Sequence, residues 1–315
     1  MTFEIIKQQF GELTEYVVQD TRNGNRFAVV PELGAVVRQL SLRKGLTLFS
    51  ILKTPPTPDK LKEDTQSASE LLFPFASRIP SGKYHFLGKD YQLHKNEKGG
   101  VNAIHGLVRK HHFSLQEQRI QPDNASIKLA YHLSQQEGYP FEVLFSVTYS
   151  LNLDGIFSLS YQAHNLGKDA CPAMFGWHPY FDLGNEEVDA WKINIPSKTI
   201  VTFDDHMIPT GEAPFPHRGA FSLLRNELDN CFVVESEGNT AITELISDNQ
   251  EVTLEIKQET GEGKFNYLVV YTPPSRDCVA IEPLTANVDA FNNGEGLNII
   301  GPDQQIAGTI TLKLR

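Results

Sequence analysis

The sequence predicts an all-β protein, a large antiparallel β-sandwich with a few short helices. Apolar and polar residues alternate with period two along most of the chain, the pattern of strands that bury one face. The clearest example is 143–151, and the alternation resumes at 157–163 after Asp154-Gly155, a pair that favours a tight hairpin turn. Helical periodicity is scarce, and its best candidate, residues 58–72, is short and interrupted.

The same pattern identifies further strands along the chain. Asn23-Gly24 separates two alternating segments and predicts a hairpin turn, and so does Leu87-Gly88-Lys89-Asp90. The remaining segments of this kind are 14–18, 26–30, 84–86, 91–93, 252–256, 265–271 and 310–314. No repeat, low-complexity tract or linker-like shift in composition interrupts them. We therefore expect two packed sheets in a single domain spanning residues 1–315.

Composition excludes several classes of partner. The chain has 315 residues, 40% of them hydrophobic, and a formal net charge of −11 with no basic block, which argues against nucleic acid or an anionic membrane surface. The N-terminus lacks the apolar run of a signal peptide and no stretch could span a bilayer, so a cytoplasmic protein is expected. The three cysteines, Cys171, Cys231 and Cys278, are far apart and indicate neither a zinc site nor a disulfide framework.

A histidine surrounded by aromatic rings is the first candidate for chemistry. His178 lies within Phe175-Gly176-Trp177-His178-Pro179-Tyr180-Phe181. Aromatic faces such as that of Trp177 could stack on an amphipathic ligand while the imidazole supplies a proton, and a sugar ring has those properties. The alternative is a core strand with a hydrogen-bonded buried histidine, and this segment alone does not decide between them.

Two charged residues lie in apolar surroundings. Arg78 stands between Phe75 and Ile79, where an arginine usually has a fixed partner, either a carboxylate or a ligand hydroxyl. Glu282 ends the apolar run 278–281, and burying its carboxylate is costly unless the group is paired or functional. A salt-bridged carboxylate at the end of a strand remains the alternative for Glu282.

A glycine-containing turn carries two more candidates, Asn102 and His105, at a place where a ligand can approach the backbone. His111 and His112 follow and raise the question of a metal site. Adjacent histidines point to opposite faces of a strand, and no carboxylate completes a ligand set at the usual spacing, so no metal is expected.

His105, His178 and Glu282 together supply an acid and a base, which suits reversible proton transfer. No cofactor is expected: the Gly-Glu-Gly segments at 261–263 and 294–296 lack the strand-to-helix context of a phosphate loop. No Gly-x-Ser-x-Gly elbow or nucleophilic cysteine signature occurs either.

At these residues the chain resembles the aldose 1-epimerase (mutarotase) family, whose members have the galactose mutarotase-like β-sandwich fold. Several motifs in the family's order carry the resemblance over most of the chain. They are Phe75-Ala76-Ser77-Arg78-Ile79, Asn102-Ala103-Ile104-His105-Gly106, Gly176-Trp177-His178-Pro179-Tyr180-Phe181, Ile208-Pro209-Thr210-Gly211-Glu212, Leu228-Asp229 and Ala280-Ile281-Glu282-Pro283-Leu284-Thr285.

The resemblance implies a role for each site residue. Glu282 would be the general base and His178 the general acid, with ordinary pKa values of about 4.3 and 6.5. His105 and Arg78 would hold sugar hydroxyls or the ring oxygen, and Asp229 would bind a hydroxyl. The expected substrate is a free hexose such as glucose or galactose, interconverted between its α and β anomers by a monomer or weak dimer.

Two departures from the family's pattern leave alternatives open. Ser77 precedes the arginine where asparagine is frequent, which puts one polar contact in doubt. His105-Gly106 is followed by Leu107-Val108-Arg109, which looks more like the hexose-6-phosphate epimerase branch, where arginines receive the phosphate. The tryptophan-bearing motif at 176–179 and the absence of a wider basic cluster favour free sugars. A non-catalytic sugar-binding protein on the same fold is the alternative from another class.

Overall fold

The computed structural model of the protein describes residues 2–184 and 186–315. Its largest sheet has nine antiparallel strands. In spatial order they are β11 (Ser114–Ile120), β12 (Asn124–Leu133), β13 (Val143–Asn152), β14 (Phe157–Asn165), β28 (Gln305–Leu314), β24 (Val252–Glu259), β23 (Thr240–Ser247), β18 (Trp191–Asn194) and β21 (Phe221–Ser222).

Two further large sheets accompany it. The eight-stranded sheet contains β20 (Pro209–Pro214), β19 (Ser197–Phe203), β22 (Asp229–Val234), β25 (Tyr267–Tyr271), β26 (Val279–Leu284), β16 (Gly176–His178) and β6 (Glu70–Leu72), with β17 (Tyr180–Phe181) also paired to β26. The five-stranded sheet contains β1 (Phe3–Phe10), β2 (Leu13–Asp20), β3 (Arg26–Val30), β4 (Val36–Lys44) and β5 (Thr47–Ser50).

The remaining elements are short. Three two-stranded sheets pair β7 (Arg78–Ile79) with β10 (Ala103–Ile104), β8 (Lys83–Phe86) with β9 (Lys89–Gln92), and β15 (Cys171–Ala173) with β27 (Asn298–Ile300). The helices are α1 (Pro58–Lys62), α2 (Ala290–Asn293) and the 3₁₀ turns η1 (Pro31–Leu33), η2 (Pro80–Gly82) and η3 (Val188–Ala190). Of the described helices, none is long and apolar enough to cross a membrane.

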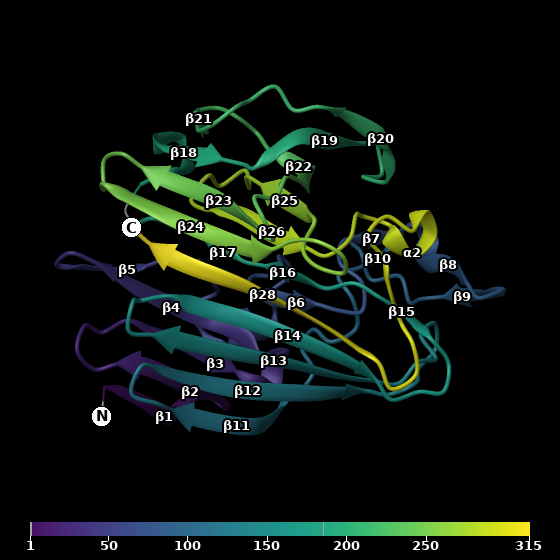
Figure 1. Ribbon diagram of the computed structural model, residues 1–315, viewed down its shortest axis with the longest axis horizontal. Coiled ribbons are helices and arrows are strands. Elements are labelled where there is room, and N and C mark those ends of the chain that lie inside the picture. The colour runs from purple at the N-terminus through teal and green to yellow at the C-terminus, as the bar shows by residue number, and fades with distance from the viewer. Residues whose placement is uncertain (1, 185) are drawn as a thin grey trace.

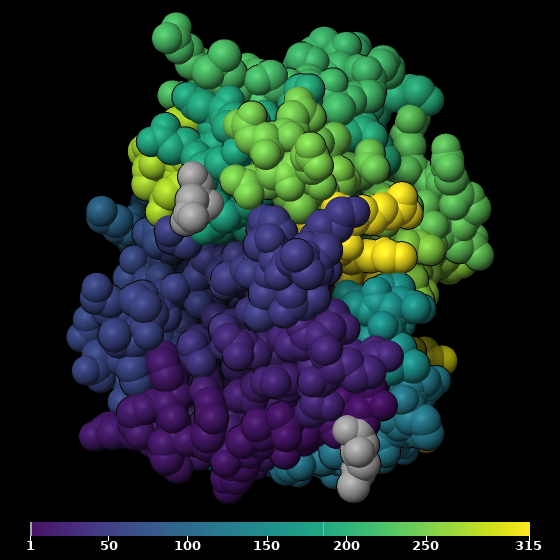
Figure 2. Space-filling view, turned by 90° about the vertical axis from the view of Figure 1, so that its left-hand side faces the viewer, coloured from purple at the N-terminus to yellow at the C-terminus, as the bar shows by residue number. Residues whose placement is uncertain are grey.

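The sheets pack face to face. In Figure 1 the nine-stranded sheet extends from β11 at the bottom through β28 to β23 near the top. Its lower strands contact the five-stranded sheet, with β2 against β12 and β13 and β4 against β28. Figure 2 shows the N-terminal strands, in purple, covering the lower half of one side and the green segments covering the upper half. The predicted antiparallel β-sandwich is confirmed.

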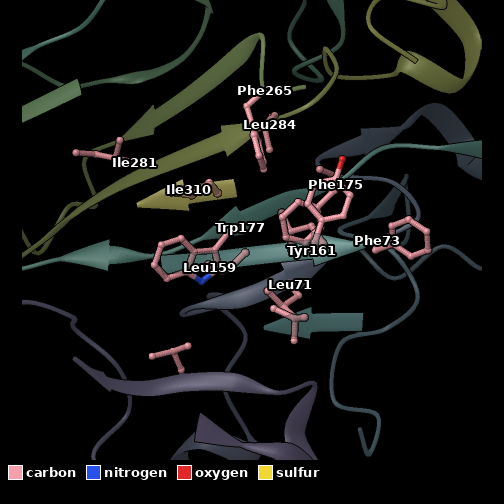
Figure 3. Packing of buried hydrophobic residues seen from close by; sticks show 14 of the residues in the cluster. Leu71, Phe73, Leu159, Tyr161, Phe175, Trp177, Phe265, Ile281, Leu284 and Ile310 are labelled. Atoms are coloured by element: carbon pink, nitrogen blue, oxygen red, sulfur yellow. The ribbon is translucent and has the colours of Figure 1, made fainter. Parts of the chain in front are cut away.

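The middle of the nine-stranded sheet, at β14 and β28, meets the eight-stranded sheet in a core rich in aromatic residues (Figure 3). Tyr161 of β14 stacks on Phe175 at a centroid distance of 4.2 Å, and Phe157 of β14 lies 6.2 Å from Trp177 of β16. Phe3 and Leu314, near the two ends of the chain, belong to the same buried cluster, and we propose that residues 1–315 form a single domain.

The hairpins follow the expected pattern, but one predicted loop and one predicted helix need correction. The loop between β8 and β9 is only Leu87-Gly88, because Lys89 already pairs with Phe86. The helical candidate 58–72 is wrong beyond Lys62: the chain takes left-handed φ values at Ser67 and Ser69, and residues 70–72 form β6. Tertiary pairing with β16 buries Leu71 and Leu72 and overrides the local helical pattern.

Candidate active site

A cavity of about 1040 Å³ lies against the eight-stranded sheet. That volume is at the upper end of the range typical of small-molecule sites. Five of the predicted site residues line it: Arg78, His105, His178, Asp229 and Glu282. The structure thus brings together residues from five separate parts of the sequence.

Neighbouring strands of the eight-stranded sheet present three of these side chains. β22, β25, β26 and β16 are adjacent in that order, and they carry Asp229 at the start of β22, Glu282 in β26 and His178 at the end of β16. Side chains alternate between the faces of a strand. Ile281, next to Glu282, therefore belongs to the buried hydrophobic cluster (Figure 3). Glu282 faces the cavity.

The same alternation corrects the prediction that Trp177 binds the substrate. Trp177 is adjacent to His178, so its ring lies on the core face between Phe157 and Phe181 and is fully buried. Its indole Nε1 donates to the carbonyl oxygen of Ser69. It does not line the cavity.

The short sheet of β7 and β10 supplies the other two side chains. Arg78 is paired with Ile104, and His105 follows directly in a left-handed conformation with φ +62°. Gly106 must be a glycine here, because a Cβ atom would lie 2.3 Å from the carbonyl oxygen of Phe73. This tight backbone approach holds His105 beside the sheet that carries His178.

A carboxyl–imidazole pair is the central contact of the site. His178 Nε2 lies 3.3 Å from Glu282 Oε1, and both side chains are more than nine-tenths buried. The ring of His105 stands nearly perpendicular to that of His178 at a centroid distance of 5.3 Å. Within the described residues the Nδ1 atoms of both histidines are buried without a hydrogen-bond partner, which is rare for buried polar atoms outside functional sites.

Burial shifts the pKa values of this pair in opposite directions. It raises the pKa of the Glu282 carboxyl well above its ordinary value, and the nearby Asp229 carboxylate adds to the rise while Arg78 opposes it. It lowers the pKa of His178 to about 4. Burial also lowers the pKa of His105, with contributions from His178 and two arginines. Burial therefore disfavours the charged form of each group, the carboxylate of Glu282 and the imidazolium of His178.

Asn102, predicted to bind the substrate, does not line the cavity. It is buried at 4% exposure, and its Nδ2 donates to Glu97 Oε2 at 2.7 Å while its Oδ1 accepts from the Ser81 amide. Glu97 does line the cavity, and its Oε1 accepts from Arg78 Nε at 2.7 Å. Sequence reasoning missed Glu97 because it lies in a polar, glycine-rich turn that looks like an ordinary surface loop.

Arg109 lines the cavity but is already paired. Its Nη1 donates to Glu70 Oε2 at 3.0 Å and to Ser67 Oγ at 2.8 Å. The lining includes four cationic side chains and four carboxyl groups, namely Arg78, Lys98, Arg109 and Lys110 with Asp64, Glu97, Asp229 and Glu282.

His111 also lines the cavity, where its ring stacks on Tyr131. Across residues 2–184 and 186–315, no three side chains of His, Cys, Asp or Glu are grouped as metal ligands would be.

These features define a class: an antiparallel β-sandwich whose polar cavity holds a buried acid–base pair beside a second imidazole and an arginine. The model of the aldose 1-epimerase family matches residues 16–313, and the chain belongs to that family.

Relatives support the assignment at low identity. The chain is 30% identical to human galactose mutarotase over 234 residues, which are 63% of this chain and 64% of that protein. It is 25% identical to the uncharacterized protein YihR of Escherichia coli over 284 residues, 88% of this chain and 86% of that one. A galactose mutarotase-like protein from Clostridium acetobutylicum shares the fold, with a TM-score of 0.85 over 100% of this chain and 99% of that one at 18% identity.

Proposed function

We propose that the protein interconverts the α and β anomers of a free hexose such as glucose or galactose. The observation that carries the proposal is the 3.3 Å contact between His178 Nε2 and Glu282 Oε1 in the cavity. Anomerisation needs one group that takes a proton from the O1 hydroxyl and another that gives one to the ring oxygen O5. Both oxygens are bonded to the same carbon, C1, so the two groups must lie side by side, as these do.

The reaction follows from these positions. Ring opening uses the form of the pair whose single proton lies on His178: Glu282 takes the proton from the O1 hydroxyl while His178 delivers one to O5, the C1–O5 bond breaks, and the open aldehyde forms. This form carries the same number of protons as the neutral pair that burial favours, so it arises when the proton moves from Glu282 to His178. Rotation about C1–C2 presents the other face of the carbonyl, and the two transfers run in reverse to close the ring. His105, Arg78 and Asp229 hold the hydroxyls during the rotation. Each positioned acid or base contributes about 10²–10⁴-fold, which is adequate for a reaction that already proceeds in water.

The cavity's charge favours a free sugar over a sugar phosphate. Phosphate sites use arginines whose charge is available to the ligand. Here Arg78 is paired with Glu97, and Arg109 is paired with Glu70. The phosphate alternative retains one support, namely that Arg109 lines the cavity and its Nε is buried without a partner in the described residues.

Polarimetry tests the proposal directly. The relaxation of α-D-glucose, α-D-galactose and glucose 6-phosphate is followed with the protein and with buffer alone. We expect acceleration for at least one free hexose and little for the phosphate. Turnover of glucose 6-phosphate alone, abolished by Arg109→Ala, would assign the protein to the phosphate branch. Sugar binding without acceleration would make it a non-catalytic binding protein.

The pH profile of kcat/KM is expected to be bell-shaped. Below about pH 4 His178 and Glu282 are both protonated, so no base is available. Because the pKa of Glu282 is raised, the last proton of the pair is lost only well above the usual glutamate range, and the alkaline limb follows that loss. The pKa of Glu282 is thus expected to lie above that of His178, which is the reverse of the order that the ordinary pKa values of glutamate and histidine give. Initial rates from pH 3.5 to 9 check it, and a single rise centred near the ordinary histidine value of about 6.5 would contradict it.

Arg78→Lys is expected to lower kcat/KM about tenfold although the charge is kept. The planar guanidinium donates to Glu97 through Nε and can still offer both terminal nitrogens to a sugar, whereas an ammonium cannot match that geometry. Steady-state kinetics on the best sugar measure the effect. Arg119→Lys is the matched control, because that arginine is paired with Glu117 on the exposed strand β11. Wild-type kcat/KM for Arg78→Lys would remove Arg78 from the sugar site.

A further inference from the structure

The loop between β9 and β10 is tied closely to the cavity wall. Glu97 accepts from Arg78 Nε with one carboxylate oxygen and from Asn102 Nδ2 with the other, both at 2.7 Å. The backbone amides of Asn96 and Glu97 donate to the carbonyl oxygen of Asn102, which closes the turn. The loop is therefore a defined structure with both oxygens of one carboxylate in use.

The neighbouring residue ties the same loop to the strand that precedes His105. Asn96 Oδ1 accepts from the Ile104 amide at 2.7 Å, and its Nδ2 donates to the Ile104 carbonyl at 3.0 Å. Ile104 in turn pairs with Arg78. One loop thus braces both Arg78 and the backbone that leads into His105.

The guanidinium of Arg78 is held at one point only. Within residues 2–184 and 186–315, Glu97 is the sole hydrogen-bond partner of the Arg78 side chain, through Nε. Both terminal nitrogens remain for a ligand, and Arg78 lines the cavity. An arginine side chain has several rotatable bonds, so the Nε contact determines where those two nitrogens lie.

We propose that Glu97 is a positioning residue: it orients Arg78 toward the sugar and is itself oriented by Asn102. The inference rests on the proposed sugar site and identifies a carboxylate outside the acid–base pair on which that site depends. Asn102 acts on Arg78 indirectly, through Glu97. Its Oδ1 accepts from the Ser81 amide, and this contact directs its Nδ2 toward Glu97. Removing either partner releases Arg78 without touching Glu282 or His178.

The network predicts an unusual substitution pattern. Glu97 must accept two hydrogen bonds, and a glutamine can accept on one side only. In Glu97→Gln the introduced amide nitrogen faces Asn102 Nδ2, so two donors meet or the Arg78 contact is lost. Adding Asn102→Asp restores the match, because the introduced aspartate accepts from the glutamine and still accepts from the Ser81 amide.

The experiment compares Glu97→Gln, Asn102→Asp and the double variant by polarimetry on the best sugar, with calorimetric sugar binding as a second readout. We expect kcat/KM to fall about tenfold or more in each single variant, since misplacement by about 1 Å can cost 10²-fold. The double variant should recover to within about threefold of wild type. Glu117→Gln, in the exposed pair with Arg119, is the control and should change nothing.

A second double-mutant cycle, between Glu97 and Arg78, separates a positioning role of Glu97 from a merely structural one. In an Arg78→Ala background, Glu97→Gln should change kcat/KM and sugar affinity by less than about twofold, because there is no guanidinium left to position. Equal losses in both backgrounds, wild-type activity in Glu97→Gln, or no recovery in the double variant would each overturn the inference. Sugar binding without epimerisation by the wild type would refute the proposed function alone, and the affinities would still decide the role of Glu97. A wild type that neither binds nor epimerises sugars would refute both.

Discussion

Glu282→Gln should reduce kcat by at least about a hundredfold in a protein that stays folded. Glutamine keeps the size and most hydrogen bonds of glutamate but cannot accept the proton from the O1 hydroxyl. Glu282 lies 3.3 Å from His178 and is only 5% exposed, so solvent cannot readily replace it as the base. Polarimetric rates at saturating sugar measure the effect.

Thermal unfolding provides the control for this variant. Burial raises the pKa of Glu282 in the folded state above its unfolded value, so ionising it costs stability as pH rises above about 4.5. Glu282→Gln should therefore unfold at a higher temperature than wild type, by a margin that grows from pH 4.5 upward. A folded, sugar-binding variant with undiminished mutarotation would show that the carboxylate is structural, and Asp229 would become the candidate base.

His178→Asn should also reduce kcat by about a hundredfold or more, since it removes the proton donor to O5. The two groups act in one relay, so the double variant with Glu282→Gln should lose far less than the product of the two single losses. Single-turnover and steady-state polarimetry on the three variants measure the coupling directly.

The chain contains a matched control for both substitutions. His132 and Glu142 form an imidazole–carboxylate pair at 2.8 Å, but both side chains are exposed and neither lines the cavity. His132→Asn and Glu142→Gln should leave kcat unchanged. Strictly multiplicative losses in the His178/Glu282 cycle would mean that the two residues act independently, and the concerted relay would be wrong.

The architecture was predictable because its signal is local. Period-two alternation at 143–151 and 157–163 specifies which residues face the core, and the structure confirms the β13–β14 hairpin residue by residue. The helical candidate was wrong at 70–72 for the opposite reason. Those residues form a strand only because β16, distant in sequence, lies beside them.

The sequence predicted several of the residues that line the cavity, but it did not predict how their side chains are arranged. Arg78, His105, His178, Asp229 and Glu282 were identified from the sequence, and all of them line the cavity. Two other residues were predicted to bind the substrate because they lie close to these histidines in the sequence, but they do not line the cavity. Trp177 is adjacent to His178 in a strand and so points the opposite way, and Asn102 shares a turn with His105 but is buried behind Glu97.

The sequence by itself determined the sandwich and its main hairpins, because strand alternation depends only on near neighbours, and it singled out Arg78, His178 and Glu282 as candidate site residues from their residue types and apolar surroundings. Tertiary structure alone decided that His178 and Glu282 meet at 3.3 Å, that Arg109 is paired with Glu70, and that Glu97 holds Arg78. Each of these contacts joins separate elements. Their distances and the pKa shifts that burial produces depend on how the sheets and loops pack, which no local pattern encodes.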